Sequence, residues 1–295
     1  MSHQNYKKFE NSPIDRNCYL KFFKRSHELI GILKSNLKVI FALNQFRSKR
    51  YSTTNSLSNS RLGTKGTTEY ASSNALEYFM TTIAVMQPYF VPYAGYFRLF
   101  AEADVVCIFD CVQFPRRGWV HRNKLPGVAG QAQWLTLPLA KGPMSERIAD
   151  LRFAENASEA LEARFKIFPA LRNIHHPLLD TMRQADGDVV SYLLKLLSIS
   201  CQELGLPFEV LRTTTLKIPN AFTGQGRVLE VCRQLNADRY INLSGGRLLY
   251  SAQEFQRKGI KLALFDEWRG SQWSILYRLL TERASQVAAE IKCQI

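Results

Sequence analysis

Most of the side chains that could bind or convert a small molecule lie between residues 83 and 138. In this stretch Gln, Tyr, Asp, Arg, Trp, His and Asn follow short apolar runs. Rigid hydrogen-bond donors and stacking faces at such positions are typical of a pocket for a polar ligand, and a purely structural domain rarely needs them at this density. We therefore expect a functional site here.

Three residues of this stretch have side chains suited to acyl-transfer chemistry. Asp110 or His121 is a candidate base for an attacking amine, and Asn123 is a candidate donor to a developing oxyanion. Asp110 also has a structural interpretation, as a turn or helix cap at the end of a strand. No Ser or Cys stands in a nucleophile elbow or triad, so covalent catalysis is not expected.

The candidate binding residues are polar aromatics, cations and glycines. Cations alternate with aromatic side chains between residues 116 and 124, which suits a phosphate and a stacked ring; a solvated basic face is the alternative. The tyrosines between residues 89 and 96 have packing in the core as their alternative. The full set is Gln87, Tyr89, Tyr93, Gly95, Tyr96, Gln113, Arg116, Arg117, Trp119, Arg122, Lys124, Ser244, Gly245 and Gly246.

No metal site is expected from the cysteines and histidines. Cys107 and Cys111 lie four residues apart, with no second pair and no His at ligand spacing. The adjacent His175 and His176 are interpreted as a helix-end or surface pair. The six cysteines are therefore expected to be free thiols, mostly buried.

From Met80 onward the pattern predicts an α/β fold, with a Rossmann-like, mostly parallel sheet flanked by helices. Short apolar runs predict strands at 83–86, 105–109, 134–137, 208–212, 240–243 and 260–265. Apolar residues spaced by three and four predict helices at 96–103, 159–174, 188–204, 226–235, 251–258 and 271–284. Residues 110–125 are expected to form a long irregular loop, which is often functional.

Residues 1–79 differ in composition from residues 80–295. They carry 13 Lys and Arg against 5 Asp and Glu, a net charge of +8 out of +14 for the chain. We expect them to be a low-order basic extension, either a targeting segment or sequence upstream of the true start. The apolar run 29–43 is too short to span a bilayer, so we expect no integral membrane segment and a cytoplasmic location.

Several motifs of the chain resemble the WbqC-like family. The matching runs are MQPYFVPYAGYF, FDCVQFPRRGWVHRNKL, QWLTLP, GQGRVLEVCRQLNADRYINLSGGRLLY and FQRKGIKLALFD, in this order across residues 82–268. The resemblance implies a transferase or ligase of O-antigen or related polysaccharide biosynthesis, which attaches an amino acid or other acyl group to an amino sugar. The family usually has two acids where this chain has Asp110 and Cys111, so a role that needs both carboxylates is not supported.

The start of the domain also resembles the nucleotidylyltransferase superfamily, pantothenate synthetase in particular. Gln113 and Phe114 match its pattern, while Tyr93 and Tyr96 stand where its two histidines contact nucleotide phosphates. This resemblance implies ATP and Mg²⁺ as cofactors, through an acyl-adenylate; a preformed activated donor is the alternative. Gly95 would allow a ligand to approach a helix N-terminus, and residues 244–246 would form a second phosphate-holding turn.

The expected partners are therefore small molecules, namely an acyl or amino-acid donor and an amino sugar carried on a nucleotide or a lipid diphosphate. A non-catalytic nucleotide-sugar binding protein is one alternative. A nucleic-acid binding module is another, but residues 80–295 carry 26 Lys and Arg against 20 Asp and Glu, and this modest net charge of +6 disfavours it.

Overall fold

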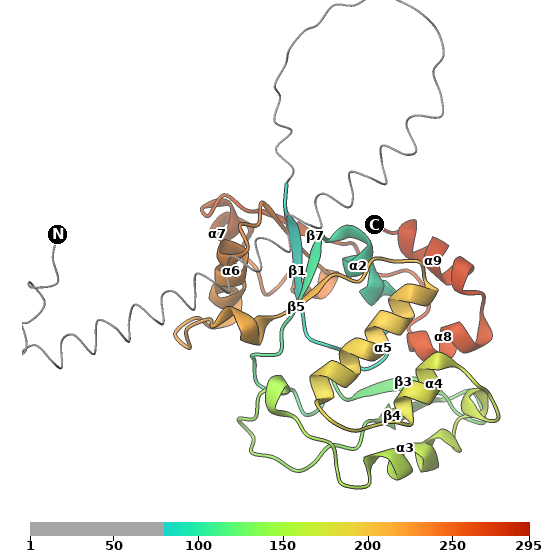
Figure 1. Ribbon diagram of the computed structural model, residues 1–295. Coiled ribbons are helices and arrows are strands. Elements are labelled where there is room, and N and C mark those ends of the chain that lie inside the picture. The colour runs from blue at the N-terminus through green and yellow to red at the C-terminus, as the bar shows by residue number, and fades with distance from the viewer. Residues whose placement is uncertain (1–79) are drawn as a thin grey trace, which may run out of the picture. The chain divides into compact units, whose positions relative to one another are not determined.

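The computed structural model describes residues 80–295 (Figure 1). The chain divides into two units, Met1–Glu77 and Tyr78–Ile295, and the description below concerns the second. The expectations for residues 1–79, namely low order, a targeting role or an early start site, lie outside the described residues.

A five-stranded parallel sheet forms the centre of the domain, as predicted. Its strands lie in the order β5-β2-β1-β6-β7. Ile83 of β1 is paired with Val105 on one side and with Tyr240 on the other. From β1 the chain first adds β2 and β5 on one side, and then adds β6 and β7 on the other. The sheet therefore has a topological switch point between β1 and β6. The strands are β1 (Thr82–Met86), β2 (Val105–Ile108), β5 (Val210–Arg212), β6 (Arg239–Asn242) and β7 (Lys261–Leu264).

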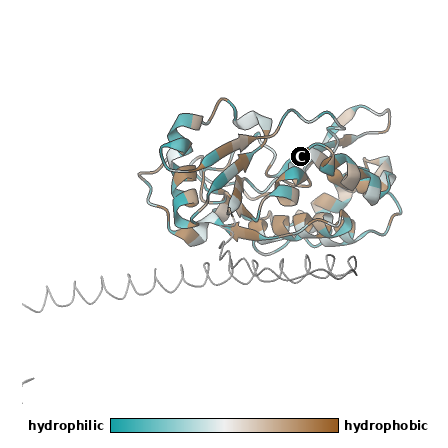
Figure 2. Cartoon of the chain, turned by 90° about the horizontal axis from the view of Figure 1, so that it is seen from above, coloured by the Kyte–Doolittle hydropathy of each residue, from teal (hydrophilic) through white to brown (hydrophobic). Residues whose placement is uncertain are grey.

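Helices cover both faces of this sheet (Figure 1). One face carries α2 (Arg98–Glu102), α5 (Val189–Glu203) and α9 (Ala284–Lys292), and the other carries α6 (Gly224–Gln234) and α7 (Ala252–Gln256). Helix α8 (Ile275–Thr281) packs next to α9. Hydrophobic residues are frequent on the strands and inner helix faces, and hydrophilic residues on the periphery (Figure 2). Within the described residues, no helix has the length and apolar character needed to cross a bilayer.

A long insertion between β2 and α5 differs from the prediction. Strands β3 (Arg122–Pro126) and β4 (Ala132–Thr136) pair antiparallel in a sheet of their own. The run 134–137 therefore does not join the parallel sheet, and residues 122–125 are not an irregular loop. The strand β3 was missed because polar Asn123 and apolar Leu125 form its buried face, which leaves no clean apolar alternation to detect.

Two predicted helices are shorter than expected. The segment 159–174 contains α3 (Ala157–Phe165) and a separate 3₁₀ turn, Pro169–Leu171, because proline has no N–H to continue the helix. The segment 271–284 contains α8, and α9 begins at its end. Helix α4 (Pro177–Met182) was not predicted; His176 caps it by accepting a hydrogen bond from the Leu178 N–H, which agrees with the helix-end interpretation of that histidine.

Candidate functional site

The switch point brings two of the predicted groups to one edge of the sheet. Gln87 directly follows β1, and Ser244 follows β6 after one residue, at the carboxyl ends of two neighbouring strands. Open parallel sheets bind ligands at this position. The loop after β1 also carries Tyr89 and Tyr93, while Gly245 and Gly246 continue the turn after β6. We take this edge as the candidate site.

Three tyrosines lie near one another here. Burial raises the pKa of Tyr89, and the neighbouring Tyr93 and Tyr250 raise it further. Burial also raises the pKa of Tyr93, although Arg98 opposes the shift. These two hydroxyls therefore stay protonated at neutral pH and can donate hydrogen bonds to a ligand. Tyr250, which was not predicted, packs against the turn after β6, since a Cβ at Gly246 would lie 3.0 Å from its ring.

Tyr96 and Gly95 have packing roles in the structure. Tyr96 is fully buried, and its hydroxyl donates a hydrogen bond to the Gln87 carbonyl oxygen over 2.8 Å. The nucleotidylyltransferase resemblance implied that this hydroxyl could contact a phosphate. In the structure it is already engaged by the Gln87 carbonyl oxygen. A Cβ at Gly95 would lie 2.5 Å from the Tyr93 ring and 2.8 Å from the Trp268 ring, so the close approach that Gly95 permits is made by aromatic side chains and not by a ligand.

Arg98 is a buried cation behind this loop that sequence reasoning missed. It is 1% exposed, and its guanidinium lies 4.9 Å from the Phe265 ring centroid and 5.4 Å from that of Trp268. It donates hydrogen bonds to the carbonyl oxygens of Gly95, Asp266 and Gln294. The charge of Arg98 is thus stabilised by aromatic rings and carbonyl oxygens and not by a carboxylate. These contacts also hold the loop after β7 against the start of α2.

Asn123 holds the loop after β1 in a strained conformation. Val91 has a φ of +38°, which is rare for a β-branched residue. The buried Asn123 amide donates to the carbonyl oxygens of Phe90 and Val91 over 3.1 and 2.8 Å, and the Ser274 hydroxyl donates to the same Val91 oxygen over 2.6 Å. Strain that is held in this way clusters at functional sites. Because the Asn123 donors are already used, the geometry gives this residue a positioning role.

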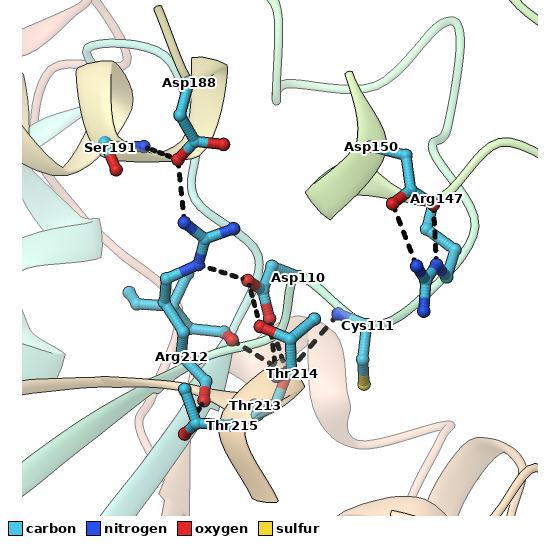
Figure 3. A network of polar contacts seen from close by, with 11 residues as sticks. Asp110, Cys111, Arg147, Asp150, Asp188, Ser191, Arg212, Thr213, Thr214 and Thr215 are labelled. Carbon is cyan, nitrogen blue, oxygen red and sulfur yellow. Dashed lines mark hydrogen bonds and ion pairs between the residues drawn. The ribbon is translucent and has the colours of Figure 1, made fainter. Parts of the chain in front are cut away.

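Asp110 lies in a closed polar network at the end of β2 (Figure 3). Its carboxylate is 0% exposed. It accepts hydrogen bonds from Arg212 Nε over 2.6 Å, from the Thr214 N–H over 3.0 Å and from the hydroxyls of Thr213 and Thr214 over 3.1 and 2.9 Å. All its acceptor directions are therefore occupied, and no amine can reach it in this arrangement.

Arg212 extends this network to α5. Its Nη1 donates to the carboxylate of Asp188, the N-cap of that helix, over 2.7 Å. Burial lowers the pKa of Arg212, but the two carboxylates outweigh burial and hold the pKa above its ordinary value. Arg212 therefore stays charged at neutral pH, and its two ion pairs tie β2, β5 and α5 together beside the candidate site.

His121 is neutral at pH 7. Burial lowers its pKa to about 4, with the charge of Arg122 as the second cause. Its ring contacts Phe114 edge-on, with 5.0 Å between the centroids, and its Nδ1 is buried without a hydrogen-bond partner. A neutral imidazole with a low pKa is a weak base, so His121 can accept a proton only from a strongly acidic intermediate.

Two predicted residues before the hairpin tie down the loop at residues 142–144. Gln113 donates to the Met144 carbonyl oxygen over 2.7 Å, and Arg116 donates to the carbonyl oxygens of Gly142 and Pro143. Their polar groups are thus engaged with the backbone, and the structure gives them a role in shaping the insertion.

Two other predicted cations, Arg122 and Lys124, lie on β3 of the hairpin, whereas Arg117 is exposed in the turn before it. The Arg122 guanidinium lies 4.1 Å from the Trp134 ring centroid, and Lys124 Nζ lies 5.0 Å from it. Trp119 packs against Trp134 with 5.4 Å between ring centroids. We call Trp119, Arg122, Lys124 and Trp134 the tryptophan face. Trp134 was missed because its run was expected to be a buried strand, whereas it is 40% exposed.

A separate cleft of about 570 Å³ lies along β6 and β7, bounded by α2 and the C-terminal residues. None of the residues predicted for the site lines it. Its cations and acids largely neutralise one another, as in the Arg239–Glu102 ion pair of 2.6 Å.

In residues 80–295 no group of three or more His, Cys, Asp and Glu side chains could hold a metal ion. The described cysteines are free, and Cys107, Cys201 and Cys232 are buried; burial raises the pKa of all three thiols. These buried thiols therefore stay protonated at neutral pH, and a protonated thiol is a poor nucleophile.

Comparison with known proteins shows the family to which the chain belongs. A profile of the WbqC-like protein family matches residues 87–277. The chain belongs to the WbqC-like protein family. It is also similar to Uncharacterized protein Rv1507c of Mycobacterium tuberculosis, with 25% identity over 194 residues, which is 63% of this chain and 83% of that protein. No solved structure matches it. The WbqC-like span includes the switch-point loops and the tryptophan face.

Proposed function

We propose that this WbqC-like protein is a cytoplasmic transferase that forms an amide between an acyl or aminoacyl group and the amine of an amino sugar, in O-antigen or related polysaccharide biosynthesis. One observation carries the proposal. Protonated tyrosine hydroxyls stand at the switch point of a parallel sheet, where ligands bind in this class of fold, and the adjoining hairpin carries cations and exposed indoles.

The reaction needs little proton transfer by the protein if the acyl donor is a preformed thioester. The sugar amine attacks the thioester carbonyl, the C–N bond forms and the C–S bond breaks. The amine loses one proton and the leaving thiolate gains one, so the protons balance without a permanent base. The hydroxyls of Tyr89 and Tyr93 and the open turn at Gly245 would donate hydrogen bonds to the oxyanion that develops on the carbonyl oxygen.

ATP and Mg²⁺ fit these residues poorly. The Tyr96 hydroxyl donates its hydrogen bond to the Gln87 carbonyl oxygen. The Asp110 carboxylate, a candidate ligand for Mg²⁺ just after β2, already accepts hydrogen bonds from four protein donors. The segment with Gly95 is a four-residue 3₁₀ turn rather than a helix N-terminus. We therefore propose a preformed donor in place of an acyl-adenylate step.

The test uses the full chain with a uridine-diphosphate amino sugar and a panel of acyl and aminoacyl thioesters. Mass spectrometry should detect the sugar nucleotide with the mass of one acyl group added. A parallel sample with ATP, Mg²⁺ and free amino acids measures pyrophosphate exchange, which we expect to be absent. Exchange with one acid would restore the adenylation route and overturn the choice of donor.

The second candidate is a nucleotide-sugar binding protein without turnover. The observation in its favour is that two of the three catalytic candidates, Asp110 and Asn123, are buried and fully engaged in internal hydrogen bonds. Tight binding of the sugar nucleotide, with no amide product from any donor of the panel, would support this candidate.

A further inference from the structure

We propose that the tryptophan face binds the acceptor substrate as a nucleoside diphosphate sugar, and that the switch point binds the acyl donor. This inference rests on the proposed function and assigns its two substrates to two places. The face is made by one side of the hairpin, because Arg122 and Lys124 alternate with the buried Asn123 and Leu125 along β3.

The cations of this face have no carboxylate partner within residues 80–295. Neither Arg122 nor Lys124 forms an ion pair with any residue that the structure describes, whereas Arg147 elsewhere in the insertion pairs with Asp150 over 2.7 Å. Arg122 donates one hydrogen bond, from Nη2 to the Arg117 carbonyl oxygen, and its Nε is buried without a hydrogen-bond partner. Positive charge that is fixed in place and not neutralised favours an anion, and a diphosphate supplies one.

The indoles of this face are not needed for the core of the hairpin. Trp119 is 41% exposed and Trp134 is 40% exposed, while Leu125 and Leu135 on the opposite side are fully buried. Arg122 stacks on Trp134 and holds its guanidinium beside the ring. Two partly open indoles that pack on each other, with two cations beside Trp134, match a ligand whose rings are joined by phosphates, which describes a nucleoside diphosphate sugar.

The face adjoins the candidate site through the backbone. The Phe90 N–H donates to the Trp119 carbonyl oxygen over 2.9 Å, and the Ser274 N–H donates to that of Lys124 over 3.3 Å. Trp119 is thus connected to the loop that carries Tyr89 and Tyr93. A sugar bound on the face would extend toward these tyrosines, where its amine can meet the donor.

A single-stranded nucleic acid is recognised by similar chemistry, but over a longer basic groove. Here the run of cations ends within the hairpin, and residues 80–295 have a net charge of only +6, from 26 Lys and Arg against 20 Asp and Glu. The size of the face favours one small ligand.

The test is isothermal titration calorimetry of the full chain with uridine-diphosphate glucosamine. Trp134→Ala should weaken binding at least tenfold. Lys124→Met should weaken it several-fold and reduce its dependence on salt. Arg257→Met removes a cation at the end of α7, which lies apart from the hairpin (Figure 1), and should leave the affinity unchanged. Urea unfolding of each variant checks that the fold is kept.

Four results would overturn the inference: no binding of the sugar nucleotide; unchanged affinity in both Trp134→Ala and Lys124→Met; equal affinity for a diphosphate sugar that carries a short lipid instead of the nucleoside; or tighter binding of a short single-stranded oligonucleotide. If the face binds the sugar nucleotide but no amide product forms, the proposed function fails while this inference stands.

Discussion

Arg212 donates a hydrogen bond from Nε to Oδ2 of Asp110 over 2.6 Å, and this bond joins the end of β5 to the end of β2. The two residues lie 102 positions apart in the chain. Three further donors from Thr213 and Thr214 complete the shell around the carboxylate. Asp110 therefore fixes the start of the insertion to the end of β5. This is a structural role for a residue that was predicted to be a catalytic base.

Asp110→Asn should destabilise the fold for two reasons. The amide has no negative charge to pair with Arg212, and its NH₂ group would point at one of the protein groups that donate to the carboxylate. We expect a loss of about 2–4 kcal/mol in the free energy of unfolding, measured with urea. Asp150→Asn is the matched control: Asp150 pairs with Arg147 on the surface, so its loss should cost less than about 1 kcal/mol. Unchanged stability of Asp110→Asn together with lost turnover would instead assign Asp110 to catalysis.

Gly95→Ala and Gly245→Ala should separate packing from ligand contact. A Cβ at Gly95 would meet the rings of Tyr93 and Trp268, whereas a Cβ at Gly245 has no neighbouring atom within 4 Å. We expect Gly95→Ala to lose about 1–3 kcal/mol of stability. Gly245→Ala should be close to neutral in thermal unfolding and should weaken binding of the acyl donor. The reverse pattern would place the ligand at Gly95.

The parallel sheet could be predicted from sequence because its strands are short apolar runs between helical patterns. Its strand order, and with it the switch point between β1 and β6, could not, because apolar runs do not say which strands are neighbours. The hairpin could not, because its strand β3 buries Asn123 and exposes Arg122 and Lys124, a pattern without an apolar signal. The shell around Asp110 was hidden for another reason: its donors are brought there by β5, far along the chain, and only the parallel pairing of Ile108 with Arg212 places them together.

Stability should depend on pH through His121. Its pKa is about 4 in the folded chain and 6.5 for an unperturbed histidine, so the unfolded chain binds more protons between these values. Stability is then lost as the pH falls from 6.5 toward 4, by about 1–2 kcal/mol once partial solvent exposure is allowed for. His121→Phe should remove this dependence of the free energy of unfolding on pH, here called the slope, when urea unfolding is measured at several pH values.

The control for this effect is His175→Phe, because His175 is exposed and should leave the slope unchanged. A slope that persists in His121→Phe and disappears in His175→Phe would contradict the assignment of the effect to His121.

Tyr89 gives the most direct test of the chemistry. The measurement is the rate of amide formation by the full chain, from an acyl thioester and a uridine-diphosphate amino sugar, followed by the mass of the product. We expect acylated sugar nucleotide from the wild type, a kcat lower by about 10–100-fold in Tyr89→Phe through loss of an oxyanion donor, and an unchanged kcat in Tyr277→Phe. Absence of product from the wild type, while the sugar nucleotide binds, would contradict the proposed transferase and leave a binding protein.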